Sequence, residues 1–353
     1  MRVRESVGEV CGRLRFHWSR DLPEPPAICF LLQFASDCNL YEFTFHYDSH
    51  RSEQSFDPQL EILTRMLNLA VAYRKQTFER MRDPLAERGI NAHHVPNEAR
   101  TFDLGDPPWT PDEFDVGFVY PSRMMEGGVV DAFLSVPWVN GCEAVLTSRN
   151  KAGVITRLGK AGIPVPKTAM VSNPVEERDL REIFARFDPP VVIKPNSTTR
   201  GTGIAKVDDL DSFLGVVDYL NLVHDYRATG DKSFLVQEYL PKATDYRAMV
   251  VDGEYVGAVE RRLPDDALDE GRWKHNVHRG AKARGITLPD EHREIAEKTA
   301  EALDISFCGV DLLDTGDRIV VNETNARPTI DAETKYEDGF YDRLAELVRA
   351  TRR

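Results

Sequence analysis

Residues 191–204, Val-Val-Ile-Lys-Pro-Asn-Ser-Thr-Thr-Arg-Gly-Thr-Gly-Ile, hold the pattern that decides the fold. The β-branched run at its start predicts a strand, which ends after Lys194 because the next residue is a proline that cannot donate to a strand ladder. A polar loop with Gly201 and Gly203 leads into a second short strand. Glycines let a backbone approach phosphate oxygens, and the lysine supplies positive charge. The pattern predicts a phosphate-covering β-hairpin, with an ordinary surface hairpin as the alternative.

Two familiar phosphate motifs are absent from this part of the sequence. A Walker loop needs four residues between its glycines, whereas Gly153 and Gly159 are separated by one residue too many and Lys160 is followed by alanine. A dinucleotide fingerprint needs glycine at the position of Lys206. A bound nucleotide is therefore expected on a β-hairpin and not on a strand-to-helix turn.

Composition disfavours several classes of protein. The chain has 353 residues, enough for two or three domains, and a formal net charge of -13 from 45 basic and 58 acidic residues. This balance disfavours nucleic acid or an anionic membrane as the main partner. Neither a membrane-spanning run of about 18 apolar residues nor a signal peptide is expected. The five cysteines form no C-x-x-C pair, which predicts a reduced, cytoplasmic protein without structural zinc.

The order of predicted strands and helices divides the chain into four parts. Residues 1–63 show little periodicity, so we expect a poorly ordered N-terminal extension, with an extra cap on the next domain as the alternative. Residues 64–148 alternate strands and helices, which predicts a small α/β domain with a parallel sheet. Residues 149–233 contain the hairpin described above. Residues 234–353 contain an Asp-Gly hairpin turn and two later strands around Asp-Thr-Gly-Asp.

A helix is expected after Asn150, whose side chain can cap it, and this helix carries Lys151 in its first turn. A cation at this end opposes the helix dipole, which is mildly unfavourable unless an anionic group lies nearby. Lys151 is therefore a candidate anion-binding residue, and a solvated surface lysine is the alternative.

Asp311, Glu323 and Asn325 form a second group of candidates. The first lies on a predicted strand over residues 308–313, and the other two come just past a strand over 318–322. Side chains two residues apart in an extended chain point the same way, and a neighbouring strand can bring Asp311 onto that face. Carboxylate and amide oxygens suit Mg²⁺ held together with phosphates. The pattern predicts a metal site at a sheet rim, or alternatively three polar residues at a strand end.

Taken in order, these motifs resemble the ATP-grasp superfamily and, within it, the ribosomal-S6-modifying, or RimK-like, type of glutamate ligase. The likeness covers about residues 66–350. Its most specific segments are Val-Gln-Glu-Tyr (236–239), Asp-Tyr-Arg (245–247), Val-Glu-Arg-Arg (259–262), His-Asn-Val-His-Arg-Gly (275–280), Gly-Val-Asp (309–311) and Glu-Thr-Asn (323–325). The resemblance implies an α/β (α+β) chain with an ATP-grasp fold, whose pre-ATP-grasp domain is Rossmann-like and whose lid and large subdomains are the last two parts.

The family pattern also implies a role for each matching residue. Arg247 looks like the arginine near the transferred phosphate, and Asn276 looks like the asparagine that reaches the nucleotide and metal. Asp311, Glu323 and Asn325 look like the ligands of Mg²⁺ (or Mn²⁺). The residues expected around ATP, from phosphates to adenine hinge, are Lys151, Lys194, Gly201, Gly203, Glu238, Tyr239, Asp245 and Lys274.

The resemblance implies a ligase reaction. ATP converts a carboxylate into an acylphosphate, and an amine then attacks it to give an amide, ADP and phosphate. Such chemistry needs positioning and charge neutralisation more than a protein nucleophile. Glutamate is the implied amino-acid donor, and the acceptor is a small molecule, cofactor or peptide carboxylate. The alternatives are a nucleotide-binding regulatory protein without turnover and a kinase that stops at phosphoryl transfer. Members of the family often form homo-oligomers, so the resemblance also implies that this chain can form one.

Two departures from the family pattern concern substrate contacts. Lys274 and His275 stand where Arg-Ser is usual, and a lysine lacks the fork needed for bidentate contacts. After Asn325 the sequence runs Ala-Arg-Pro-Thr where Pro-Gly is usual. This second departure predicts an acceptor that differs from the family's best-known substrates.

Overall fold

The chain, seen in a computed structural model, divides into two units on either side of the link between Arg65 and Met66. The structure describes residues 15–17, 30–36, 39–45, 66–198, 201–223, 231–275, 277, 280–332 and 335–352. In the first unit the described strands pair antiparallel in the order β1 (Arg15–His17), β2 (Phe30–Ser36) and β3 (Asn39–Phe45). The prediction of a poorly ordered extension over residues 1–63 falls mostly outside the described residues.

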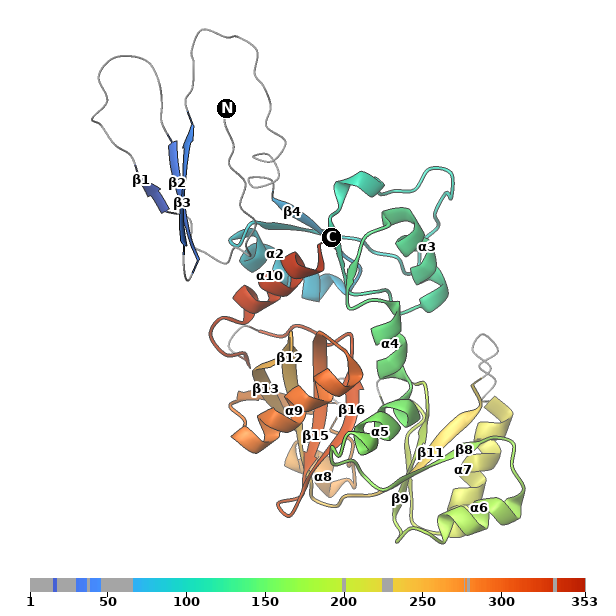
Figure 1. Cartoon of the computed structure of the whole chain (residues 1–353). Coiled ribbons are helices and arrows are strands. Elements are labelled where there is room, and N and C mark those ends of the chain that lie inside the picture. Colours follow the sequence, from blue (N-terminus) through green and yellow to red (C-terminus); the bar gives the residue numbers. More distant parts are fainter. Residues whose placement is uncertain are drawn as a thin grey trace, which may run out of the picture. The chain divides into compact units, whose positions relative to one another are not determined.

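A four-stranded parallel sheet opens the second unit, as the alternating sequence pattern predicts (Figure 1). The order across the sheet is β5-β4-β6-β7. Because every pair is parallel, the carboxyl ends of the strands meet at one edge. The elements, in chain order, are β4 (Leu67–Val71), α2 (Lys75–Ala86), β5 (Ile90–His94), η1 (Pro111–Glu113), β6 (Val116–Phe118), α3 (Met124–Leu134) and β7 (Trp138–Val139).

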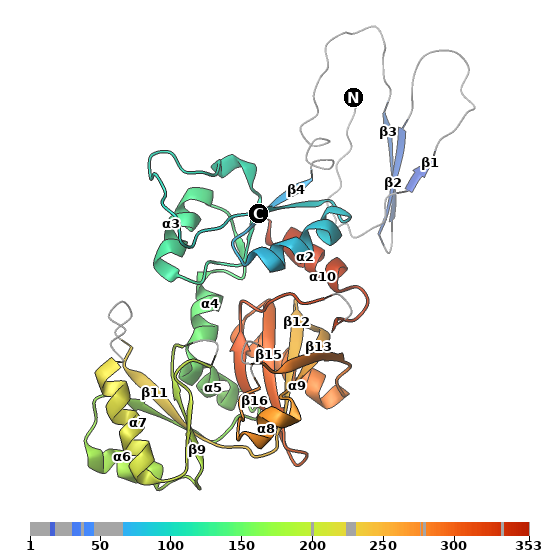
Figure 2. The ribbon, with the colours of Figure 1, turned by 180° about the vertical axis from the view of Figure 1, so that it is seen from behind.

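Two consecutive helices, α4 (Cys142–Arg149) and α5 (Lys151–Lys160), follow this sheet (Figure 2). Asn150 separates them, and its side-chain oxygen accepts the N–H of Gly153 at 3.0 Å. The predicted cap is therefore present, and it fixes where α5 begins.

The lid is a four-stranded antiparallel sheet with two helices packed on it. Its order is β10-β9-β11-β8, and the predicted hairpin is confirmed because Ala205 of β10 pairs with Ile193 of β9. The lid elements are β8 (Thr168–Ser172), α6 (Glu177–Phe184), β9 (Val191–Pro195), β10 (Ala205–Val207), α7 (Leu210–Val223) and β11 (Ser233–Glu238). Since β11 belongs to this sheet, the lid sheet extends to Glu238, beyond the boundary that the sequence pattern predicted between residues 233 and 234. The division of the chain into four parts stays a prediction.

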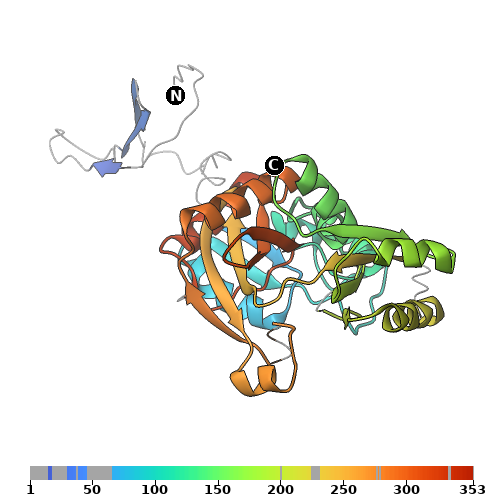
Figure 3. The same ribbon diagram turned by 90° about the horizontal axis from the view of Figure 1, so that it is seen from below.

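A five-stranded antiparallel sheet in the order β14-β13-β12-β15-β16 forms the rest of the unit. In Figure 3 this sheet, in orange, lies to one side of the lid, in green and yellow. The predicted turn between β12 and β13 is present, with positive φ at Asp252 and Gly253. Its elements are β12 (Thr244–Val251), β13 (Glu254–Arg262), α8 (Asp265–Asp269), β14 (Lys282–Ile286), α9 (Asp290–Leu303), β15 (Phe307–Asp314) and β16 (Ile319–Asn325).

Two details of this part bear on the site. The expectation that the last strand ends at residue 322 is wrong, because β16 continues to Asn325 across a bulge opposite the Asp311–Leu312 step. The final helix, α10 (Phe340–Thr351), returns to lie beside α2, where the Tyr341 hydroxyl donates to the carbonyl of Arg80 at 3.0 Å (Figure 1). Among the described residues, no helix has the length and apolar character needed to cross a bilayer.

Candidate functional site

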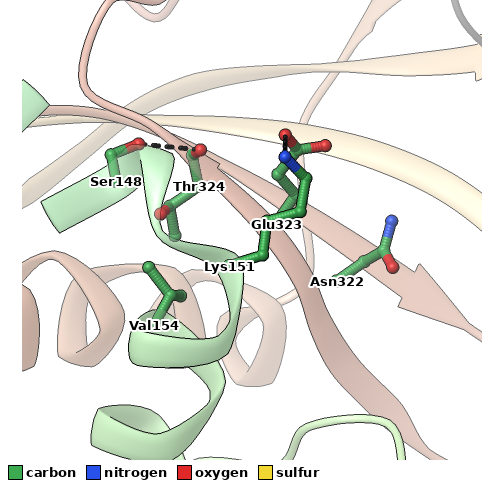
Figure 4. Close-up of a pocket in the computed structure, with 6 residues that line it drawn as sticks. All are labelled: Ser148, Lys151, Val154, Asn322, Glu323 and Thr324. Atoms are coloured by element: carbon green, nitrogen blue, oxygen red, sulfur yellow. Dashed lines mark hydrogen bonds and ion pairs between the residues drawn. The ribbon is translucent and has the colours of Figure 1, made fainter. Parts of the chain in front are cut away.

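Lys151 lies between the hairpin and the end of β16. Its buried ammonium donates to the carbonyl of Thr198 and lies 3.5 Å from Oε1 of Glu323. Figure 4 shows this ion pair at a small pocket, which Ser148, Lys151, Val154, Asn322, Glu323 and Thr324 line. Lys151 is therefore not a solvated surface lysine, and it has the anionic neighbour that a cation in the first turn of a helix requires.

The start of α5 is fastened to the hairpin through Asn196. The side-chain oxygen of Asn196 accepts the N–H of Ala152 at 2.9 Å, and its amide donates to the side chain of Asn150 at 3.1 Å. The first bond satisfies a free backbone N–H at the helix N-terminus, and the second ties the capping residue to the hairpin. They also hold Lys151 at a fixed place beside the hairpin.

Lys194 is buried at the end of β9. Its ammonium donates to the side-chain oxygens of Gln237 at 2.5 Å and Asn322 at 2.7 Å. Burial lowers the pKa of Lys194 to about 8, although the carboxylate of Glu323 opposes the shift. Sequence reasoning missed both acceptors. Asn322 reaches the lysine because it is the extra residue of the β16 bulge, which no sequence signal marked.

The two hairpin glycines have backbone conformations that other residues adopt rarely. Gly201 and Gly203 have φ of 65° and 74°, and a Cβ at Gly203 would lie 2.9 Å from Cγ of Pro195. The loop is closed by the Thr198 hydroxyl, which donates to the carbonyl of Thr202 at 3.0 Å. The described part of the loop thus has a conformation suited to exposing backbone N–H groups, and its contact with phosphate stays a prediction.

Glu238 lies at the start of the segment that connects the lid to the five-stranded sheet, and its side chain holds this segment in place. One carboxylate oxygen accepts the backbone N–H of Lys167 at 2.6 Å, and the other accepts Arg318 at 2.6 Å. The Tyr239 ring lies edge-on to Trp273, with centroids 5.8 Å apart. The Glu238 side chain is therefore occupied by protein contacts, and a hinge role for this pair stays a prediction.

Lys274 joins the loop after α8 to the hairpin. Its ammonium donates to the carbonyl of Ile204 and lies 5.4 Å from the centroid of Trp273. The neighbouring ring of Tyr239 has Lys206 5.1 Å from its centroid. Asn276, the predicted catalytic asparagine, lies outside the described residues.

Four charged side chains, two of them buried (Arg261 and Asp311), alternate in sign across β13, β12 and β15. Arg247 donates to both oxygens of Asp311, at 2.6 and 2.8 Å. Arg261 donates to Asp245 at 2.9 Å and also lies 3.1 Å from Asp311. The register places Arg247 opposite Asp311 and Asp245 opposite Arg261, which is why these side chains share one face. Sequence reasoning quoted Arg261 within a motif but gave it no role.

The two carboxylates of this network have opposite pKa shifts. Burial raises the pKa of Asp311, but the guanidiniums of Arg247 and Arg261 outweigh burial and lower it overall. Burial raises the pKa of Asp245, and Arg261 offsets that rise only in part. Asp311 therefore keeps its charge, as a metal ligand must.

The donor chemistry of Asp311, Glu323 and Asn325 fits Mg²⁺. The first two lie opposite each other in the β15–β16 register, and Asn325 follows on the same strand. No group of three or more His, Cys, Asp or Glu side chains that could hold a metal occurs in the described part of the chain. Two carboxylates and an amide would thus need phosphate oxygens to complete the shell. The side chain of Glu323 is 25% exposed against 5% for Asp311, so Glu323 is the more accessible of the two predicted ligands.

Comparison with known proteins identifies the family to which the chain belongs. A family model described as a RimK-like ATP-grasp domain matches residues 148–340. The chain belongs to the RimK-like ATP-grasp family. This RimK-like chain is 30% identical to a probable alpha-L-glutamate ligase of Stenotrophomonas maltophilia (strain K279a) over 194 residues, 54% of the chain and 62% of the relative. It is also 30% identical to a ribosomal protein bS6–L-glutamate ligase of Escherichia coli O139:H28 over 199 residues, 56% of the chain and 62% of the relative.

The match therefore spans less than two thirds of these relatives. A solved structure of a RimK domain protein ATP-grasp from Sphaerobacter thermophilus is similar with a TM-score of 0.58 and 20% identity. The superposition covers 80% of this chain and 98% of the Sphaerobacter protein's chain. This likeness confirms the predicted ATP-grasp fold of the RimK-like chain.

Proposed function

We propose that this chain is an ATP- and Mg²⁺-dependent ligase that joins a carboxylate to an amine through an acylphosphate. One observation carries the proposal: two lysines and a carboxylate from three separate elements converge. Lys151 of α5 lies 3.5 Å from Glu323, and Lys194 of β9 donates to Asn322 beside it. Paired cations next to a hard oxygen ligand are what binding and transfer of a phosphoryl group require.

Each charged residue has a part in this reaction. Lys151 and Lys194 bind the phosphates of ATP, and Arg247, oriented by Asp311, neutralises charge on the transferred group. Glu323, Asp311 and Asn325 would hold Mg²⁺, which when bound neutralises phosphate charge. The hairpin with Gly203 covers the phosphates and excludes water from the acylphosphate.

Glutamate is the proposed amino-acid donor, and a carboxylate on a small molecule, cofactor or peptide is the proposed acceptor. Support comes from the names of the curated relatives, which describe L-glutamate ligases, one of them acting on ribosomal protein bS6. The residues after Asn325 in this chain give a different loop, so we do not assign the bS6 acceptor to it. A cytoplasmic location and a homo-oligomer stay predictions.

The test is ADP release by the full-length chain with ATP and Mg²⁺, using a panel of amino acids against a panel of carboxylates. Release that requires both an amine and a carboxylate is expected. Release with a stable phosphorylated product and no amine dependence would indicate the kinase alternative. ATP binding without release under every pairing would favour the regulatory alternative and contradict the ligase proposal.

A further inference from the structure

Arg327 is a partly buried arginine with no carboxylate partner among the described residues. Its guanidinium donates to the carbonyls of Ala72 and Val119, each at 3.4 Å, and to that of Tyr120. It lies 4.7 Å over the ring of Tyr73. Carbonyls and a ring bear no net negative charge, and withdrawing a guanidinium even partly from water without a counter-ion is costly.

Two more arginines add positive charge at this place. Burial lowers the pKa of Arg327 to about 10; Tyr73 and Glu98 oppose the shift, and the charges of Arg149 and Arg74 add to it. Arg149, the last residue of α4, donates to the carbonyl of Ser122 at 2.7 Å. Arg74 is exposed, and within the described part of the chain neither it nor Arg149 pairs with a carboxylate.

The nearest acidic group is already engaged. Glu98 is exposed, and it accepts the hydroxyl of Ser122 at 2.5 Å. One exposed carboxylate does not balance three guanidiniums. The arrangement is therefore electrostatically incomplete, which is the condition in which a protein surface recruits an anion.

The cluster stands where open α/β sheets bind ligands. Arg74 follows β4, Asn97 follows β5, and Tyr120 follows β6, so all three lie at the carboxyl edge of the parallel sheet. The side-chain nitrogen of Asn97 is buried there and, within the described part of the chain, donates no hydrogen bond. An unused donor at this edge is a second indication of a missing acceptor.

The loop that carries Arg327 is fixed from several sides. The N–H of Ala326 donates to the hydroxyl of Ser148 at 3.0 Å, and its carbonyl accepts the amide of Asn140 at 2.7 Å. The hydroxyl of Tyr73 donates to the carbonyl of Arg327 at 2.7 Å. Ser148 also lines the Lys151 pocket, so the backbone just before Arg327 is bonded to the wall of the candidate phosphate site.

We propose that Arg327, assisted by Arg74 and Arg149, binds a substrate carboxylate that is not the one activated by ATP. A guanidinium matches the two oxygens of a carboxylate with two parallel hydrogen bonds. The assignment of this anion as a substrate group rests on the proposed ligase function. Either the amino acid or the acceptor supplies the carboxylate, and both can be tested.

The experiment is calorimetric titration of L-glutamate and, separately, of glutarate into the full-length chain saturated with ADP and Mg²⁺. Arg327→Ala should weaken binding of at least one of them by about 10- to 100-fold and leave ADP affinity unchanged. Arg327→Lys should recover part of the affinity. An effect on L-glutamate alone assigns the site to the amino acid, and an effect on glutarate alone assigns it to the acceptor.

Arg293→Ala is the matched control, because Arg293 also lies over a tyrosine ring, 4.9 Å from Tyr255, and donates to a carbonyl, that of Leu288. It has a carboxylate partner in Glu337, so its loss should not change carboxylate binding. Arg74→Ala, at an exposed position, serves as the second variant if Arg327→Ala does not fold.

Three results would overturn the proposal. One is a wild-type chain that binds neither carboxylate at millimolar concentration. Another is unchanged affinity in Arg327→Ala, or in Arg74→Ala where that variant replaces it. The third is inorganic phosphate that binds as tightly with the same dependence on Arg327. Carboxylate binding that depends on Arg327, with no amide formed in the ADP-release assay, would uphold this site while rejecting the ligase function.

Discussion

The ammonium nitrogen of Lys151 lies 3.5 Å from Oε1 of Glu323, and their side chains are only 7% and 25% exposed. One residue opens helix α5, and the other lies near the end of β16, so the ion pair joins two distant parts of the chain at the candidate site. A bound nucleotide would place its phosphates against this lysine. The pair therefore links the predicted phosphate-binding and metal-binding functions.

Glu323→Gln should lower ligase turnover by at least about 100-fold, because it removes the more accessible of the proposed metal ligands. Its effect on the free energy of unfolding should stay near about 1 kcal/mol, because Lys151 keeps its hydrogen bond to the carbonyl of Thr198 and the Glu323 side chain is itself 25% exposed. Rates of ADP release and urea unfolding curves measure the two effects. A turnover rate equal to that of the wild type would remove Glu323 from the metal site.

Asp311→Asn should behave differently and lower the free energy of unfolding by about 3 kcal/mol or more. The substitution leaves the buried guanidinium of Arg261 and the partly buried one of Arg247 without the carboxylate that both contact. Asp314→Asn, on the same strand, is the control, since Asp314 is less buried and His292 is its one ion-pair partner among the described residues. Equal losses in the two variants would show that the buried network does not stabilise the fold.

Lys194→Ala should weaken ATP binding by about 10- to 100-fold, because it removes the buried cation that we propose binds the phosphates. Titration of ATP into the full-length chain measures this, with Lys160→Ala, an exposed lysine at the end of α5, as the control. Unchanged affinity in Lys194→Ala would place this lysine outside the nucleotide site.

ATP affinity should also depend on pH through Lys194. With a pKa of about 8 in the free protein, the lysine is mostly protonated at pH 7 and mostly neutral at pH 9. Since only the protonated form attracts phosphate, affinity should fall by about 10-fold between these values. Lys194→Gln should lack this fall. A wild-type affinity that is flat over this range would contradict the burial-induced shift.

Gly203→Ala should lower ATP affinity by disturbing the hairpin loop. The residue has a φ of 74°, and the added Cβ would meet Cγ of Pro195 at 2.9 Å. Gly253→Ala is the control, because Gly253 has a φ of 80° but no atom near the added Cβ. Both variants should lose about 1 kcal/mol of stability from the positive φ, and only Gly203→Ala should lose nucleotide affinity as well.

Local signals in the sequence predicted local structure well. The proline and glycines of the hairpin, the cap at Asn150 and the Asp252–Gly253 turn each depend on the conformation of a few neighbouring residues. The fold followed because these signals occur in the order typical of the ATP-grasp family. The same signals placed Lys151 and Lys194 among the candidates.

What the sequence did not predict depends on pairing between distant strands. Asn322 reaches Lys194 only because a bulge adds one residue to β16. Arg261 contacts Asp311 from two strands away. The arginines whose charges act on Arg327 come from the start of α2 (Arg74) and the end of α4 (Arg149). The predicted boundary assigned β11 to the start of the large subdomain, but this strand pairs with β9 of the lid. The prediction missed this because composition does not show which strands pair.

Topologically, residues 168–237 are an insertion. They enter the lid at β8 and leave it at β11, and these neighbouring strands pair Thr168 with Gln237. Just outside them, the N–H of Glu238 donates to the carbonyl of Lys167 at 3.0 Å, so the two flanks of the chain already touch. A short turn would join those flanks without displacing any strand of the five-stranded sheet. The lid is thus one continuous segment whose entry and exit lie side by side, the arrangement typical of an inserted domain, and the sheet with Asp311 and Glu323 lies wholly after it in the chain.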